Sequence, residues 1–255
     1  MSNSSPSIVW FRKDLRLGDH PALQAAIDRG QPLILLYMLE EDLARPHGGA
    51  RKVWLHHSLK SLQADIDARG GRLILRQGQV DKVLNDLIEE TGAGAVFWNR
   101  RYHGPDRDRD AAIKSDLNER GLQVESFKGN LLVEPWEVKT KSGGPYRVFT
   151  PFWRAAKEQL TVDDPIPTPE TLNCIDGNVG SDALDNWKLL PNRPDWGSKM
   201  LDYHVPGEAG ASERLSEFLA GPMEDYAEGR DRADKDLTSR LSPHLAHGEI
   251  SPRQI

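Results

Sequence analysis

Pro32-Leu-Ile-Leu-Leu-Tyr-Met-Leu39 is a stretch that is apolar at every position. A strand with one face in water alternates apolar and polar residues, whereas a strand covered on both faces is apolar throughout. The stretch therefore predicts a strand in the interior of a parallel sheet, with helices packed on both faces.

The segments on either side of this strand alternate between strand and helix patterns. Residues 7–11 form a short apolar run, and residues 50–69 carry apolar side chains at helical intervals up to the helix-ending pair Gly70-Gly71. The same patterns predict helices at 21–29, 80–90 and 106–120, and strands at 72–76, 95–99 and 123–127. Five strands alternating with four helices predict a doubly wound, Rossmann-like α/β domain over residues 1–130.

Ligands of doubly wound sheets bind beyond the carboxyl ends of the strands, where the strand order reverses. This edge corresponds to the segments after the first, second and fourth predicted strands, namely residues 12–16, 40–51 and 99–106. Arg51, Asn99 and Arg100 lie at this edge, and solvation is the favoured interpretation for all three. Arg12, Asp14 and Arg16, taken alone, are typical of a solvated loop with local ion pairs.

The composition indicates a soluble globular protein, with 38% hydrophobic and 28% charged residues. The amino terminus has no basic region followed by an apolar stretch, and no segment has the pattern of a membrane span, so a cytoplasmic protein is expected. A formal charge of −6 disfavours a uniformly basic nucleic-acid binder.

Several kinds of site are disfavoured by missing patterns. Cys174 is the single cysteine, which excludes an internal disulfide and a cysteine-rich metal site. His47, His56 and His57 have no cysteine or carboxylate partner at metal-ligand spacing, so no metal is predicted. The first strand is followed by no Gly-x-Gly-x-x-Gly, and no P-loop occurs, which disfavours nicotinamide and nucleoside-triphosphatase functions.

The pattern changes after Leu131. An extended, proline-rich passage follows, with one helix expected near residues 151–160. Connections of this length usually join two domains, so residues 131–207 are predicted to be an interdomain linker. Helical spacing returns from Glu208, and residues 208–255 are predicted to begin a helical domain.

This last segment contains a candidate anion site in Thr238-Ser-Arg-Leu-Ser-Pro243. Ser242-Pro243 is predicted to be an N-cap followed by proline at the first helical position, and Gly248 to end the helix. The free N–H groups of a first helical turn could bind a phosphate, although a cap alone is the plainer interpretation. Ser251-Pro252 repeats the pattern of a helix start.

Three segments of the chain resemble the DNA photolyase and cryptochrome family, in the family's order. They are Trp10-Phe-Arg-Lys-Asp-Leu-Arg-Leu-Gly-Asp-His-Pro-Ala-Leu23, Gly143-Gly-Pro-Tyr-Arg-Val-Phe-Thr-Pro-Phe-Trp153, and the run Thr238 to Ser242 with Tyr226 upstream. The resemblance covers essentially the whole chain. It implies an α/β domain that can hold a light-harvesting antenna pigment, a linker, and a helical domain that binds flavin adenine dinucleotide (FAD).

The resemblance also implies which residues contact these cofactors. The implied FAD contacts, above all to the pyrophosphate, are Tyr226, Thr238, Ser239, Arg240, Leu241 and Ser242. The candidate antenna contacts are Arg51, Asn99, Arg100 and Asp106. Folate-binding members carry Asn-Glu where this chain has Pro105-Asp106, so methenyltetrahydrofolate, a deazaflavin and no pigment all stay open.

The implied activity is light-dependent repair of cyclobutane pyrimidine dimers in UV-damaged DNA, by electron transfer from reduced FAD. Such an enzyme is a carbon–carbon lyase. The alternatives are a cryptochrome-type blue-light receptor and an antenna module without enzyme activity. Family members continue for about two hundred residues more, a second domain's worth. We therefore expect the catalytic residues to lie beyond Ile255, and the 255-residue chain to be a monomer that is inactive alone.

Overall fold

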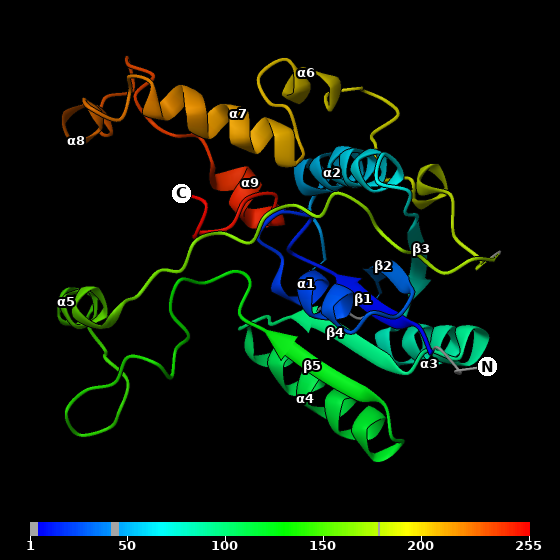
Figure 1. The fold of residues 1–255 in the computed structure, drawn as a ribbon. Helices are drawn as coiled ribbons and strands as arrows, with labels where there is room; N and C mark the ends of the chain where they lie inside the picture. The colour runs from blue at the N-terminus through cyan, green and yellow to red at the C-terminus, as the bar shows by residue number, and fades with distance from the viewer. Residues whose placement is uncertain (1–4, 42–45, 178) are drawn as a thin grey trace.

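The computed structural model describes residues 5–41, 46–177 and 179–255 and is built on one five-stranded sheet (Figure 1). All neighbouring strands are parallel, and the order is β3-β2-β1-β4-β5. The strands are β1 (Ser7–Phe11), β2 (Leu33–Glu40), β3 (Leu73–Gly78), β4 (Ala95–Asn99) and β5 (Gln123–Phe127). The predicted strands are confirmed, with end shifts of one or two residues.

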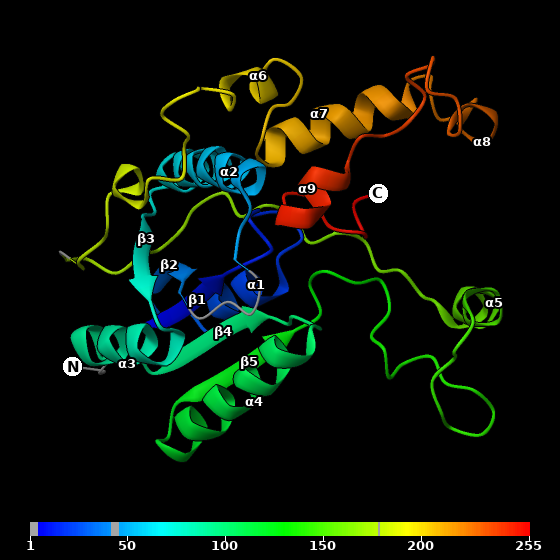
Figure 2. The same cartoon turned by 180° about the vertical axis from the view of Figure 1, so that it is seen from behind.

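Helices cover both faces of this sheet (Figures 1 and 2). The helices α1 (Pro21–Asp28) and α2 (Gly49–Asp67) share one hydrophobic core with the sheet. The helices α3 (Val80–Thr91) and α4 (Gly104–Glu119) form the second core on the opposite face. Because β2 is covered from both sides, its apolar run has no solvent face, and the doubly wound prediction is confirmed.

The strand order reverses between β1 and β4. β1 pairs with β2 on one side and with β4 on the other, so the carboxyl ends of these strands lie together. Trp10 and Trp98 are register partners across this pair, with ring centroids 5.9 Å apart in an edge-to-face arrangement. Both are buried, as is Trp54 on α2.

The connection at residues 131–207 has two different parts. Its first part carries α5 (Phe149–Gln159), which projects from the sheet domain and leaves Phe149 72% exposed (Figure 1). The second part returns to the α/β domain, where Cys174 forms an isolated parallel β-bridge with Leu33 through backbone hydrogen bonds. It continues through the 3-10 turn η1 (Leu184–Trp187) and α6 (Ser198–Leu201), and Trp187 is part of the core beside α2.

Residues 208–255 contain α7 (Glu208–Leu219), α8 (Tyr226–Gly229) and α9 (Ser242–His247). The predicted Ser242 N-cap is wrong by one position. Leu241 already has helical backbone angles and is the N-cap, while Ser242 is the first helical residue and makes no side-chain cap bond. Gly248 ends α9 in the left-handed conformation, with φ of 69°, as predicted.

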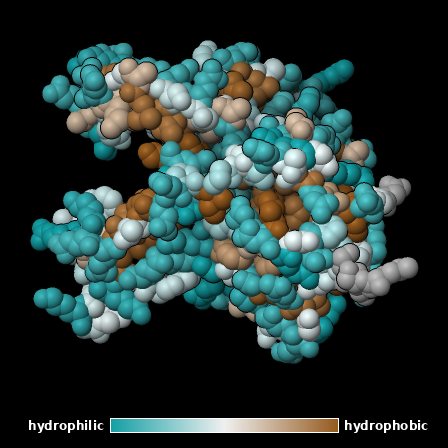
Figure 3. Space-filling view, in the orientation of Figure 1, coloured by the Kyte–Doolittle hydropathy of each residue, from teal (hydrophilic) through white to brown (hydrophobic). Residues whose placement is uncertain are grey.

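The surface is hollowed between the α7–α8 arm and α5 (Figure 3). Hydrophobic side chains gather on both sides of the hollow. Exposed hydrophobic side chains of these elements include Phe149 and Trp153 on α5 and Leu219 at the end of α7.

Candidate functional site

A cavity of about 290 Å³ lies at the carboxyl edge of the sheet, where the strand order reverses. We call it the central cavity. Its wall combines residues after β1, β2 and β4 with α2 and α9 and includes Lys13, Met38, Glu40, Arg51, Asp106 and His247. The rule for doubly wound sheets predicted a site at this edge, and the cavity lies there.

A buried carboxylate and several cations set the charge of the central cavity. Glu40 binds Arg101 at 2.7 Å and Arg109 at 2.8 Å. Burial alone would raise the pKa of Glu40, but the two arginines outweigh it and lower the pKa below its usual value. Glu40 is therefore ionised at neutral pH, and its charge balances part of the cationic wall.

Two imidazoles give the cavity hydrogen-bonding capacity that the protein leaves unused. His47 Nδ1 and His247 Nε2 are buried and have no hydrogen-bond partner among the described residues. Burial and the nearby Arg51 charge lower the pKa of His47 to about 4, so its ring is neutral at neutral pH. Together with the apolar Met38 and Leu55, these rings fit a planar heterocycle with polar edges.

The four candidate antenna residues do not lie together. Arg51 and Asp106 line the central cavity. Asn99 is only 1% exposed, so its predicted solvation is wrong; its Nδ2 donates to Asp14 at 2.9 Å. Arg100 is half-buried and contacts Glu134 in a different cavity. Arg101, next in the chain, lines both this cavity and the central cavity. No local signal distinguishes Arg100 from Arg101, because both follow β4 in irregular backbone.

The predicted solvated loop after β1 is also wrong. Arg12, Asp14 and Arg16 are all buried. Arg12 makes a two-point contact with Asp110, at 2.9 and 2.7 Å. Arg16 donates to the carbonyl oxygens of Asp19 and Gly248, each at 2.9 Å. Buried guanidinium groups need such partners, and contacts more than 90 residues away supply most of them.

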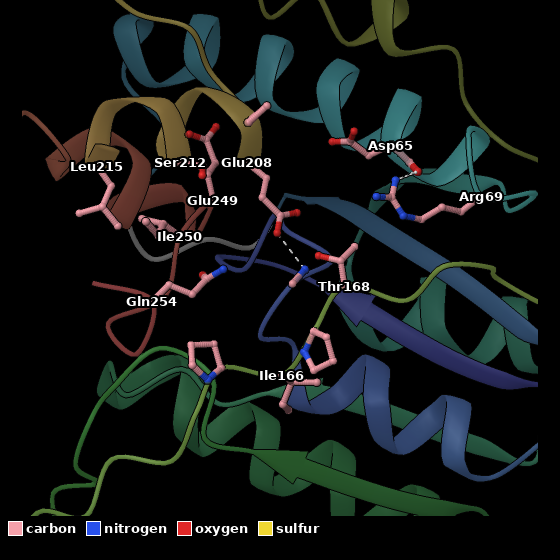
Figure 4. A pocket seen from close by; sticks show the side chains of 14 residues that line it. Asp65, Arg69, Ile166, Thr168, Glu208, Ser212, Leu215, Glu249, Ile250 and Gln254 are labelled. Carbon is pink, nitrogen blue, oxygen red and sulfur yellow. Dashed lines mark hydrogen bonds between the residues drawn. The ribbon is translucent and has the colours of Figure 1, made fainter. Parts of the chain in front are cut away.

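This loop is the docking point for residues 208–255. Leu15 N–H donates to the carbonyl of His247 at 3.1 Å, and a side chain on Gly248 would collide with the Lys13 carbonyl. The Glu208 carboxylate accepts from the N–H groups of Leu17 and Gly18, at 2.7 and 2.9 Å. Figure 4 shows Glu208 pointing at the loop from the start of α7. The helical segment is thus fixed to the edge of the sheet.

A second attachment joins α2 to α9. Trp54 Nε1–H donates to Glu249 Oε1 at 2.9 Å, and the other oxygen of Glu249 lies 2.5 Å from His244 Nδ1. His247 stacks on Trp54, with ring centroids 5.8 Å apart. Because His247 also lines the central cavity, α9 is both a cavity wall and the continuation of the Thr238–Ser242 run.

The six candidate FAD residues form two groups. Thr238 to Ser242 are one continuous run leading into α9. Tyr226 belongs to α8, at the far end of α7 from α9 (Figures 1 and 2), and packs edge-on against Phe218. Gly229, at the other end of α8, packs closely against Leu237, the residue just before the run.

The backbone of the run is held while its polar side chains stay accessible. Arg214 binds the carbonyl oxygens of Ser239 and Thr238, at 3.1 and 3.4 Å. The hydroxyls of Thr238 and Ser242 have no hydrogen-bond partner in the described part of the chain. Arg240 has a positive φ of 52° and pairs with Asp236 at 2.8 Å. Hydroxyls and a guanidinium fit a diphosphate group chemically.

Residues 5–41, 46–177 and 179–255 lack two kinds of feature. No cluster of three or more histidine, cysteine or acidic side chains there could hold a metal ion. Nor do these ranges contain a helix long and apolar enough to cross a membrane.

Comparisons with known proteins agree with this architecture. The deoxyribodipyrimidine photo-lyase of Agrobacterium fabrum is 49% identical over 252 residues, which are 99% of this chain and 52% of that protein. Cryptochrome-1 of Arabidopsis thaliana is 35% identical over 255 residues, which are 98% of this chain and 37% of that protein. A crystal structure of a bacterial class III photolyase from Agrobacterium tumefaciens matches with a TM-score of 0.95 at 49% identity, covering 99% of this chain and 52% of that one.

The chain spans about half the length of these photolyases. The family described as DNA photolyase matches residues 7–170, which is more than half of the chain and includes the whole sheet. The chain therefore belongs to the DNA photolyase family.

Proposed function

We propose that these residues serve in light-dependent repair of cyclobutane pyrimidine dimers in UV-damaged DNA, by electron transfer from reduced FAD. The observation that carries the proposal is the double role of α9, which continues the Thr238–Ser242 run and closes the central cavity with His247. Two ligand sites are thereby joined by one short helix. The 49% identity to a photolyase, against 35% to a cryptochrome, favours repair over signalling.

In this proposal, residues 1–130 are the antenna domain, 131–207 the connection, and 208–255 the start of the FAD-binding domain. Bound FAD would supply the electron for dimer splitting. Arg240 would neutralise a phosphate, Thr238 and Ser242 would donate hydroxyl hydrogen bonds to it, and Tyr226 would pack at the edge of the cofactor. Extruding a damaged base pair from the duplex also requires less free energy than extruding an intact one, which favours selective binding of dimers.

The central cavity is the proposed antenna site, for a folate or a deazaflavin. Arg51 and Asp106 would bind polar groups of the pigment, and the unused ring nitrogens of His47 and His247 would complete its hydrogen bonds. Met38 and Leu55 would cover its apolar surface.

Two other functions share the same fold. A cryptochrome-type blue-light receptor is supported by the 35% identity to Cryptochrome-1. An antenna module without enzyme activity is supported by the central cavity, which is built mainly from the α/β domain. A repair assay on the full-length protein separates them, because the 255-residue chain is expected to be inactive alone: under blue light, only a photolyase removes thymine dimers from an oligonucleotide.

The cofactor assignments are tested first by the absorption spectrum of the purified chain and mass identification of released pigments. FAD affinity is then measured by fluorescence titration in Arg240→Ala. Losing one charge-assisted phosphate contact should weaken binding about tenfold. Arg232→Ala is the matched control, since Arg232 pairs with Asp234 at 2.7 Å in the same segment. Equal FAD affinity in the Arg240 and Arg232 variants would contradict the proposed flavin site.

A further inference from the structure

A second cavity, of about 380 Å³, lies between α4, the ends of β4 and β5, and residues 135–136. We call it the α4 pocket. Its wall includes Trp98, Tyr102, Arg107, Ala111, Lys114 and Trp136. Arg101 lines both this pocket and the central cavity, and Arg100, one of the candidate antenna residues, lines only the α4 pocket. The six residues named above belong neither to the central cavity nor to the candidate FAD residues, so the proposed function gives them no role.

One side of the α4 pocket is an aromatic platform that is fixed in place. Trp136 is 52% exposed, with the Arg100 guanidinium 5.8 Å from its ring centroid and the Tyr102 ring 6.3 Å away. The buried carboxylate of Glu134 holds both neighbours, at 2.7 Å from Arg100 and 2.8 Å from the Tyr102 hydroxyl. Because these side chains are already ordered, a ring that stacks on Trp136 loses little affinity to ordering them.

One of the residues that line the pocket also has a buried polar atom without a partner. Trp98 is buried, and its Nε1–H has no acceptor among the residues that the structure describes. Leaving a buried donor unpaired is unfavourable, so a ligand oxygen that reached it would gain a hydrogen bond.

The α4 side of the pocket supplies positive charge. Arg107 and Lys114 are two helical turns apart and flank Ala111, whose small side chain leaves the space between them open. Lys114 has no acidic partner in the described ranges, and Arg107 pairs only with the exposed Asp108. The acidic side chain in the wall, Asp110, is already neutralised by Arg12.

We propose that the α4 pocket binds a nucleoside monophosphate unit, with the base stacked on Trp136 and the phosphate held by Lys114 and Arg107. Bases of every kind stack on exposed aromatic rings, and lysine and arginine are the usual phosphate partners. The volume lies within the range of small-ligand sites. The unit can come from a free nucleotide or from a single-stranded nucleic acid.

The test is calorimetric titration of the full 255-residue chain with AMP and, separately, with an eight-residue oligothymidylate. Ala111→Trp fills the pocket from an exposed helix position, and Lys114→Glu reverses its charge. Both should weaken binding at least about tenfold. Lys82→Glu is the matched control, because Lys82 is an exposed lysine on α3 outside the pocket. Its binding should equal that of the wild type.

Each result has a defined meaning. Tighter binding of AMP than of the oligonucleotide, per site, identifies a free nucleotide as the ligand; the reverse order identifies a single strand. Absence of saturable binding of both up to about 10 mM overturns the proposal. So does binding that Ala111→Trp leaves unchanged, because the ligand then sits elsewhere. The proposed flavin and antenna functions are unaffected by either failure.

Discussion

Arg16 is a fully buried arginine that is satisfied largely by backbone carbonyl oxygens. Its partners include Asp19 in its own loop and Gly248 at the end of α9, so one side chain links two distant parts of the chain. Gly248 complements it by allowing the Lys13 carbonyl to approach closely. At the scale of single residues, the attachment of residues 208–255 to the loop after β1 therefore depends on the Arg16 guanidinium and on the absence of a side chain at Gly248.

Gly248→Ala should lower the free energy of unfolding by more than the cost of placing an alanine at positive φ. Gly30 has the same φ of 69° but open space around it, so Gly30→Ala isolates the backbone cost, about 1 kcal/mol. Gly248→Ala adds the collision with the Lys13 carbonyl and should cost clearly more. Urea unfolding of both variants measures the difference. Equal free energies of unfolding in the two variants would mean that the contact between Gly248 and the Lys13 carbonyl can relax without destabilising the protein.

His47→Gln should flatten the pH dependence of stability. Burial and Arg51 lower the pKa of His47 from 6.5 to about 4 in the folded protein. As the pH falls below 6.5, His47 is protonated in the unfolded chain but stays neutral in the folded chain, so the free energy of unfolding decreases. The variant lacks this loss, and its melting temperature should fall less between pH 6.5 and about 5, where carboxylates stay largely ionised. Some slope should remain, because burial lowers the pKa of His247 as well. Identical slopes in both proteins would contradict the assignment.

The pairing of α2 with α9 shows how two elements far apart in sequence line one cavity. Trp54 lies between His244, His247 and Glu249 of the carboxyl-terminal segment. Arg51, one turn earlier on α2, lines the central cavity. The packing of α9 against α2 therefore also shapes the proposed antenna site.

A double-mutant cycle measures this helix contact. Trp54→Phe removes the donor and Glu249→Leu removes the acceptor; each should cost about 1–3 kcal/mol, because its partner is left buried and unpaired. The double variant should be more stable than the sum of the single costs predicts, by about 1 kcal/mol. Trp187→Phe is the control, since Trp187 bonds Asp182 instead. Its cost should add to that of Glu249→Leu. An additive Trp54 cycle would show that the contact contributes nothing specific.

At the scale of the whole molecule, two segments outside the sheet domain differ in their attachment. Residues 208–255 are held by Arg16, Glu208 and Glu249 contacts. α5 projects outward (Figure 1), Phe149 and Trp153 are exposed, and the preceding residues 139–148 are mostly exposed as well. The segment before α5 should therefore be the part of the chain that is most accessible to proteases.

Limited trypsin digestion should cut first after Lys139 and Lys141, which are exposed next to a turn. The two fragments should stay associated, since residues after α5 return to the sheet through Cys174 and Trp187. Size-exclusion chromatography followed by denaturing electrophoresis checks both points. The double variant Lys139→Gln, Lys141→Gln should slow the first cut. Early release of residues 208–255 would contradict the docking described here.

Local patterns predicted most of the fold. The apolar run of β2, the helical spacing of α2 and the glycine after α9 each act within a few residues, and all three are confirmed. The position of the central cavity was predictable too, because it follows from strand order and the direction of parallel strands.

The sequence by itself determined the succession of strands and helices along the chain, the parallel sheet and the edge where the central cavity lies, because these depend on short-range periodicity and backbone hydrogen bonding. Only the tertiary structure decided that Arg16 and Asn99 are buried, that Arg101 rather than Arg100 faces the central cavity, and that α9 closes it. These outcomes depend on contacts between residues that are far apart along the chain, and no local pattern specifies which distant partner will satisfy a buried charge.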